Sequence, residues 1–258
     1  MSAFVTDAGD GGLPLTGERT VPGVAVENYW FRRHEVVYAR LAQLCAGRDM
    51  LEAGCGEGYG ADLIASVART VIAVDYDAAA VAHVRNRYPR VQVLAGNLAS
   101  LPLGDSAVDV VVNFQVIEHL WDQPQFITEC LRVLRPGGLL LISTPNRITF
   151  TPGSDTPVNP FHTRELNAAE LAELLTGAGF RIDGLYGVFH GPRLLEMDIR
   201  HGGSIIDAQI ARALADAPWP AELAADVAAV RTEDFDLLRA DERDIDDSLD
   251  LVAIAVHP

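Results

Sequence analysis

Short apolar runs alternate with amphipathic stretches along most of the chain, and their order indicates the architecture. The apolar runs are brief and nearly continuous, which is typical of strands buried on both faces of a parallel sheet. They predict strands at 49–52, 70–74, 91–95, 108–112 and 139–144. The stretches between them predict helices that begin at 61 and span 78–88 and 124–134. This alternation predicts an α/β fold with a doubly wound parallel sheet.

Farther along the chain the pattern is less regular. Asn167 and Glu170 have the spacing of a capping box, which predicts a helix over 167–177. Two further strands are predicted at 181–186 and 249–256, so the expected sheet has seven strands.

Residues 187–248 are predicted to form a mostly helical insertion before the last strand, with helices at 204–214 and 221–230. Such a segment cannot bury its apolar faces alone. It therefore either folds over the crevice at the sheet edge or packs against another subunit of a homo-oligomer.

The amino-terminal region divides into two parts. Residues 1–16 are rich in Gly and Asp and predict a flexible tail, so residues 17–258 form the predicted single domain. Residues 27–34 predict a helix near the crevice, and its aromatic side chains either join the core or clamp a ligand.

Glycine occupies every second position directly after the first predicted strand, in the segment Glu52-Ala53-Gly54-Cys55-Gly56-Glu57-Gly58-Tyr59-Gly60. A glycine loop between a strand and a helix lets the backbone approach a ligand closely. The spacing Gly56-x-Gly58-x-x-Ala61 also fits a loose dinucleotide fingerprint, and a purely structural turn is the third interpretation. Glu52 favours S-adenosylmethionine, because a carboxylate attracts its cationic amino group but repels a pyrophosphate.

Polar residues follow the next strands in an order that completes a nucleoside site. Asp75 ends the second strand, where a carboxylate binds a ribose diol. Residues 96–98 follow the third strand, where an adenine would lie. Residues 113–120 follow the fourth strand, at the edge where open parallel sheets bind ligands.

These motifs resemble those of the class I S-adenosylmethionine-dependent methyltransferases over residues 17–190. The resemblance rests on the glycine motif that begins at Glu52, on Asp75, on Ile117-Glu118-His119-Leu120 and on the segment 132–138. It implies a Rossmann-like fold, a final strand antiparallel to the sixth, and S-adenosyl-L-methionine as cofactor. It also implies cofactor contacts from Glu52, Gly54, Gly56, Tyr59, Asp75, Tyr76, Asn97, Leu98, Asn113 and Gln115.

Within that family, the segments 17–19, 143–146 and 159–166 look like the branch that modifies sugars. The whole chain is similar to enzymes assigned to methylglucose lipopolysaccharide synthesis. This implies a polysaccharide-biosynthesis O-methyltransferase whose oligosaccharide acceptor is an α-glucan, methylated mainly at glucose O6. Asn97 departs from the family pattern, because many relatives carry Asp there, although its carbonyl can still accept a hydrogen bond from adenine.

Transfer of a sulfonium methyl to a sugar hydroxyl requires alignment of the acceptor and removal of its proton. Histidine is the side chain best suited to accept that proton near neutral pH. His119 and His162 are the candidate catalytic bases, because they follow the fourth and fifth strands. The candidate substrate contacts are Tyr29, Arg33, Asn146, His190 and His201. The remaining histidines are predicted to be structural or solvated: His34, His83 and His257.

Other functions are weighed against the same residues. Asn113 is followed by Phe114-Gln115 instead of Pro-Pro, which argues against an exocyclic amine acceptor, and the chain has no Pro-Cys for pyrimidine C5 chemistry. An O- or C-methyltransferase of a small quinone or lipid remains the alternative, because that branch shares Glu118-His119-Leu120. The third interpretation is a cofactor-binding module without catalysis.

Composition narrows the choice further. The net charge of -16 over 258 residues argues against nucleic acid as a partner, because nucleic acid binding needs clustered cations. No apolar run approaches the ~18 residues that membrane insertion needs, and the first residues do not have the pattern of a secretory signal, so a cytoplasmic protein is expected. The three cysteines are scattered, and neither a disulfide nor a metal site is predicted.

Overall fold

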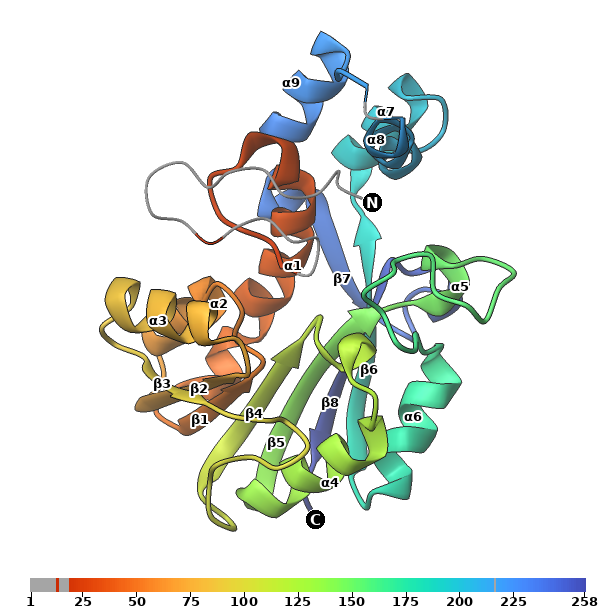
Figure 1. Ribbon diagram of the computed structural model, residues 1–258. Helices are drawn as coiled ribbons and strands as arrows, with labels where there is room; N and C mark the ends of the chain where they lie inside the picture. The colour runs from red at the N-terminus through yellow and green to blue at the C-terminus, as the bar shows by residue number, and fades with distance from the viewer. Residues whose placement is uncertain (1–12, 14–18, 216) are drawn as a thin grey trace.

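Eight strands form one mixed sheet in the order β3-β2-β1-β4-β5-β8-β6-β7 in the computed structural model (Figure 1). The structure describes residues 13, 19–215 and 217–258, so all of the predicted tail over 1–16 except Leu13 lies outside the described residues. The strands are β1 (Asp49–Ala53), β2 (Thr70–Asp75), β3 (Gln92–Ala95), β4 (Val108–Phe114), β5 (Leu134–Pro145), β6 (Arg181–His190), β7 (Phe235–Arg239) and β8 (Asp250–Val256).

The first five strands are parallel, and the last three are added in antiparallel fashion. β1 pairs with β2 on one side and with β4 on the other, so the strand order reverses at β1. β8 lies between β5 and β6 and is antiparallel to both, which confirms the expected orientation of the final strand beside the sixth. The reversal at β1 places the ends of β1 and β4 next to each other, which is where ligands of doubly wound sheets bind.

Two sequence predictions need correction. The sheet has eight strands instead of seven, because β7 lies inside the predicted insertion and pairs with β6, which continues to His190. Residues 135–138, which the sequence predicts as a turn between the predicted helix at 124–134 and the predicted strand at 139–144, are part of β5. Val108 pairs with Leu134 and Val110 with Leu139, so the extra residues form a bulge. A bulge keeps both flanking segments in one strand, which the sequence could not distinguish from a turn.

Helices cover both faces of the sheet (Figure 1). One face packs against α1 (Asn28–Leu41), α2 (Tyr59–Ala65) and α3 (Ala78–Arg87), and the other against α4 (Gln123–Val133) and α6 (Ala168–Gly177). Asn167 caps α6 in a capping box with Glu170, as its sequence predicted. The short helices are α5 (Arg147–Phe150), η1 (Ala25–Glu27), η2 (Ala42–Cys45), η3 (Ile117–His119), η4 (Thr232–Asp234) and η5 (Ile245–Asp247).

Three helices stand beyond the carboxyl edge of the sheet and are called the helical lobe here: α7 (Pro192–Arg200), α8 (Ile205–Leu214) and α9 (Ala221–Ala229) (Figure 1). Their apolar side chains, including Leu194, Met197 and Val227, share one buried cluster with α1 and β7. The Asn28 side chain donates hydrogen bonds to the Val227 and Val230 carbonyls, which fixes the start of α1 to the end of α9. Among the described residues, no helix has the length and apolar character needed to cross a membrane.

Candidate active site

The glycine loop after β1 is held in a conformation that requires glycine. Gly54, Gly56 and Gly58 all have positive φ, at +87°, +53° and +94°. A Cβ on Gly54 would lie 2.5 Å from a Val116 methyl group, and a Cβ on Gly60 would lie 2.2 Å from the Tyr38 ring. The loop is therefore fixed between the ends of β4 and α1, with its backbone close to the carboxyl edge.

Glu52 is a buried carboxylate at the end of β1. The Tyr38 hydroxyl donates to its Oε1 at 2.6 Å, whereas Oε2 is buried and has no hydrogen-bond partner among the described residues. Burial raises the pKa of Glu52 to about 8, against the opposing effects of the Tyr38 hydroxyl and the nearby Ala61 amide. A buried polar atom without a partner carries a free-energy cost, and a ligand donor at Oε2 would remove it.

Asp75 fixes the glycine loop to the end of β2. Its Oδ2 accepts from the Gly56 amide at 2.8 Å, and its Oδ1 accepts from the Asp77 amide at 2.9 Å. Asp77 in turn caps α3 and forms an ion pair with Arg19. Each Asp75 oxygen keeps a second lone pair, so the carboxylate can still accept bonds from a diol.

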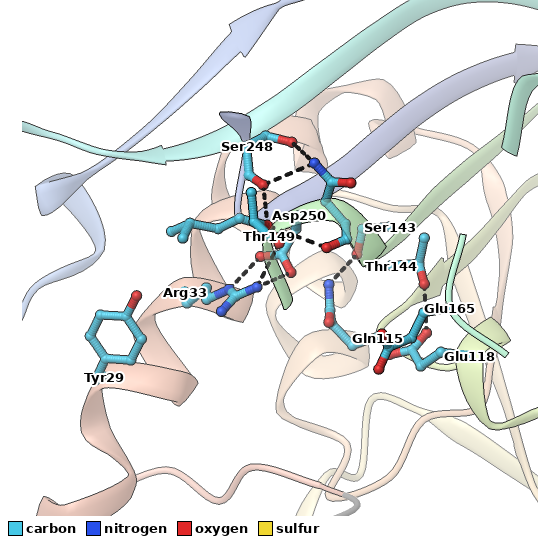
Figure 2. Close-up of polar contacts among 12 residues, drawn as sticks. Tyr29, Arg33, Gln115, Glu118, Ser143, Thr144, Thr149, Glu165, Ser248 and Asp250 are labelled. Atoms are coloured by element: carbon cyan, nitrogen blue, oxygen red, sulfur yellow. Dashed lines mark hydrogen bonds and ion pairs between the residues drawn. The ribbon is translucent and has the colours of Figure 1, made fainter. Parts of the chain in front are cut away.

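The other predicted cofactor residues lie around the same edge. Leu98 is buried and Tyr76 is 76% exposed, while the Asn97 side-chain oxygen accepts from the Ala99 amide. Asn113 donates from Nδ2 to the Ala53 carbonyl, and its buried Oδ1 has no partner among the described residues. The Tyr59 ring packs against the rings of Phe31 and Tyr38. The Gln115 side chain, just after β4, donates a hydrogen bond to the Ser143 hydroxyl on β5 (Figure 2).

The two predicted catalytic histidines lie in contact beside a buried carboxylate. Their ring centroids are 4.9 Å apart, and His119 Nε2 lies 4.0 Å from Glu118 Oε1. Glu118 is 1% exposed, and the Thr144 hydroxyl donates to its Oε2 at 3.0 Å (Figure 2). Burial raises the pKa of Glu118 to about 7, against the opposing effect of His162. We call Glu118, His119 and His162 the crevice cluster.

Hydrogen bonds fix the tautomers of both histidines. His119 Nδ1 lies 3.0 Å from the Phe161 carbonyl, which can only accept, so Nδ1 carries the proton and Nε2 the lone pair. His162 Nδ1 lies 2.7 Å from Glu165 Oε1, and His162 Nε2 lies 3.0 Å from the Asn159 amide nitrogen. The Asn159 oxygen already accepts from the Phe161 amide, so its nitrogen donates to His162 Nε2.

The predicted substrate residues are bonded within the protein. Tyr29 contacts His190 Nε2 at 2.6 Å, and His190 Nδ1 contacts Asp198 at 2.7 Å. Arg33 makes two hydrogen bonds to Asp250 in a fully buried pair (Figure 2).

Asn146 and His201 likewise have protein partners. The Asn146 amide nitrogen donates to three carbonyls around η5, and His201 Nε2 contacts Asp226 at 2.9 Å. His201 also lines a cavity of about 360 Å³ in the helical lobe, together with Arg212, Glu222 and Leu223. A substrate role for these five residues therefore stays a prediction.

Comparison with known proteins identifies the family. Residues 51–142 match the model of a methyltransferase domain. A probable S-adenosylmethionine-dependent methyltransferase of Mycolicibacterium smegmatis is 76% identical over 246 residues, which cover 95% of this chain and 96% of that protein. The chain belongs to the S-adenosylmethionine-dependent methyltransferases. A methyltransferase of the same description from Mycobacterium tuberculosis is 72% identical over 247 residues, covering 95% of this chain and 90% of that protein.

More distant similarities agree with this family. A ubiquinone biosynthesis O-methyltransferase of Rhizobium leguminosarum is 29% identical over 161 residues, covering 57% of this chain and 64% of that protein. The crystal structure of a methyltransferase from Thermotoga maritima, described as a possible histamine N-methyltransferase, has a TM-score of 0.61 at 17% identity. The match covers 90% of this chain and 99% of that one, and it shows a shared fold alone.

The cofactor of this methyltransferase is S-adenosyl-L-methionine, and the sheet edge fits it. The unpartnered Glu52 Oε2 suits a cationic amino group, and the glycine loop lets a ligand approach the backbone. Asp75 stands at the end of β2, the position at which a carboxylate binds a ribose in doubly wound nucleotide-binding sheets.

Two residues that contact the predicted site residues were not predicted from the sequence. Tyr38, whose hydroxyl donates to Glu52, lies on α1 and carries no local signal. Glu165 follows His162 at a spacing of three, a spacing that could have indicated the pair. His34 stays a predicted structural residue, and burial lowers the pKa of His34 to about 4.

Proposed function

We propose that this methyltransferase acts on a hydroxyl group of an oligosaccharide, with glucose O6 of an α-glucan in methylglucose lipopolysaccharide synthesis as the acceptor. The observation that supports it best is the crevice cluster: a histidine with a fixed lone pair lies beside the end of β4. A sugar hydroxyl needs such a base, because it is far less acidic than imidazolium.

In this proposal the bound cofactor supplies an electrophilic methyl group on a sulfonium centre. Glu52, the glycine loop and Asp75 hold it at the ends of β1 and β2. Asn97 and Leu98 border the adenine, while Asn113 and Gln115 line the end of β4. Tyr59 and Tyr76 complete the proposed cofactor contacts.

His119 is the proposed general base. The Phe161 carbonyl holds the proton on Nδ1, so the Nε2 lone pair can accept the hydroxyl proton. Glu118 stabilises the imidazolium that forms, because its Oε1 lies 4.0 Å from Nε2. His162 is the alternative base, and its Nε2 would have to exchange the Asn159 amide for the acceptor hydroxyl.

The acceptor is proposed to lie between the sheet edge and residues 187–248, which include the helical lobe. Tyr29, Arg33, Asn146, His190 and His201 border that side. The acidic net charge agrees with a neutral sugar acceptor instead of a polyanion. We propose a cytoplasmic location, where S-adenosylmethionine is available as the methyl donor. If the protein forms a homo-oligomer, we propose that the subunits contact each other through the helical lobe.

The second candidate acceptor is a small quinone or lipid. It is favoured by the partial similarity to a ubiquinone biosynthesis O-methyltransferase, whose match covers 57% of this chain. The third candidate, a binding module without catalysis, predicts cofactor binding without turnover.

The test is a mass-spectrometric screen of glucan, mannan, quinone and fatty-acid acceptors with isotope-labelled cofactor. A labelled methyl ether at glucose O6 supports the proposal. A methyl ether at another hydroxyl keeps the sugar class and corrects the position. A labelled quinone or carboxylate with inert glucans overturns it in favour of the second candidate.

A further inference from the structure

The crevice cluster has the composition of a metal site as well as that of a base. One potential ligand atom from each of Glu118, His119 and His162 lies within 4.8 Å of the other two. Two histidines and one carboxylate form a common ligand set for divalent transition metals, with open positions left for other ligands. No local sequence pattern indicates this site, because Glu118-His119 and His162 are far apart in the chain.

The surrounding contacts match those that orient metal ligands. A metal-binding histidine usually donates its second ring N–H to a carboxylate or a backbone carbonyl. His119 donates from Nδ1 to the Phe161 carbonyl, and His162 donates from Nδ1 to Glu165. Both imidazoles therefore keep their lone pairs on Nε2.

The carboxylates add two independent observations. The Thr144 hydroxyl donates a hydrogen bond to Glu118 Oε2. The other oxygen, Oε1, lies 4.0 Å from His119 Nε2. Glu165 is 3% exposed, and its Oε2 has no hydrogen-bond partner among the described residues. Two buried carboxyl groups beside two imidazoles form a site that a bound cation would stabilise.

We propose that Glu118, His119 and His162 bind one divalent transition-metal cation, with Glu165 and the Phe161 carbonyl orienting the two imidazoles. Bonds of ~2.0–2.2 Å set the ligand atoms roughly 3–3.5 Å apart, so the three side chains must converge by about 1 Å. Binding also displaces the Asn159 amide from His162 Nε2.

The cation and the base function exclude each other at His119, because one lone pair cannot bind both a metal and a proton. The metal site is therefore a property separate from the proposed acceptor, and it can be measured without acceptor or cofactor. Saturation with zinc should stop transfer if His119 is the base, and a chelator should restore it.

Titration calorimetry of the chelator-treated full chain with zinc chloride tests the site. The wild-type protein should bind one equivalent. Glu118→Gln should weaken binding by at least about tenfold, and Glu165→Gln by about 10- to 100-fold through loss of imidazole orientation. Asn159→Ala should bind at least as tightly as the wild type. His257→Ala, at the opposite end of the sheet, is the matched control and should bind normally.

Circular dichroism of each variant confirms that the protein is folded. No stoichiometric binding by the wild type overturns the proposal, as does Glu118→Gln binding with wild-type affinity. Zinc that binds at the cluster and accelerates transfer supports the metal site but contradicts His119 as the base, so the two proposals fail separately.

Discussion

The cofactor edge of the sheet and the region around the helical lobe both carry polar side chains that the sequence predicted as ligand contacts. The two regions differ in whether these side chains already have hydrogen-bond partners within the protein. At the cofactor edge, Glu52 Oε2 and Asn113 Oδ1 are buried without partners among the described residues. Around the lobe, His190 lies between Tyr29 and Asp198, and Arg33 is paired with Asp250.

This difference in hydrogen bonding indicates which polar groups are candidates for ligand contacts. Buried polar groups are nearly always hydrogen-bonded, so an unpartnered one needs an explanation. A bound ligand would explain Glu52 and Asn113, whereas His190 and Arg33 already have protein partners, and their contacts join α1 to β6, α7 and β8.

The largest effect is expected from His119→Ala. Loss of a general base typically lowers the rate about 100- to 10,000-fold, so turnover should collapse while cofactor affinity stays near the wild-type value. Steady-state kinetics and calorimetry measure the two quantities, with His257→Ala as the control. His162→Ala should instead raise mainly the acceptor KM. If His162→Ala shows the larger loss of kcat, the roles of the two histidines are reversed.

Asp250→Asn tests whether the buried pair is structural. It leaves the Arg33 charge buried without its carboxylate, which should lower the free energy of unfolding by about 3–5 kcal/mol in urea denaturation. Asp183→Asn is the control, because it breaks the ion pair with Arg181, whose two side chains are 63% and 59% exposed. It should lower the free energy of unfolding by less than about 1 kcal/mol. A stable Asp250→Asn protein with a raised acceptor KM would place Arg33 among the substrate contacts. This result would contradict the interpretation that the bonded side chains around the lobe are structural.

Asp75→Ala probes the cofactor edge. Loss of hydrogen bonds from a charged group should weaken S-adenosylmethionine binding by about 1–3 kcal/mol, measured by calorimetry. Part of this loss comes from the Gly56 amide, which Asp75 holds in place. Asp62→Ala removes the partly buried partner of the exposed Arg90 and serves as the control. Unchanged affinity, or an equal preference for NAD, would contradict the assignment.

The parallel half of the fold follows from the sequence because its signals are local. Apolar runs end at polar residues, and Asn167 with Glu170 marks the start of α6. β7 was missed because its residues, Phe235-Asp236-Leu237-Leu238-Arg239, do not alternate cleanly. Their extended conformation depends on pairing with β6, which no local pattern shows.

The candidate site was predictable to the same extent. Its histidines were found because they follow strands, and the ends of parallel strands meet at one edge. Tyr38 with Glu52 and Arg33 with Asp250 were not, since these pairs are 14 and 217 residues apart and form only on folding. The sequence predicted which residue types could react or bind a ligand. It did not predict which of them have a hydrogen-bond or ion-pair partner in the folded protein.

The most direct test of the account is the proton balance of S-adenosylmethionine binding. Glu52 has a pKa of about 8 in the folded protein, so below that pH it is mostly protonated, and a cationic amino group at Oε2 must drive the proton off. Between pH 6 and 7.5, affinity should therefore rise with pH, by up to about tenfold per unit. Calorimetry in buffers of different ionisation enthalpy should show about one proton released per bound cofactor at pH 6. Glu52→Gln should bind more weakly, with no proton release and a flat pH dependence. Release of a proton by Glu52→Gln equal to that of the wild type would contradict the claim that the open carboxylate at the end of β1 is the cofactor-binding group.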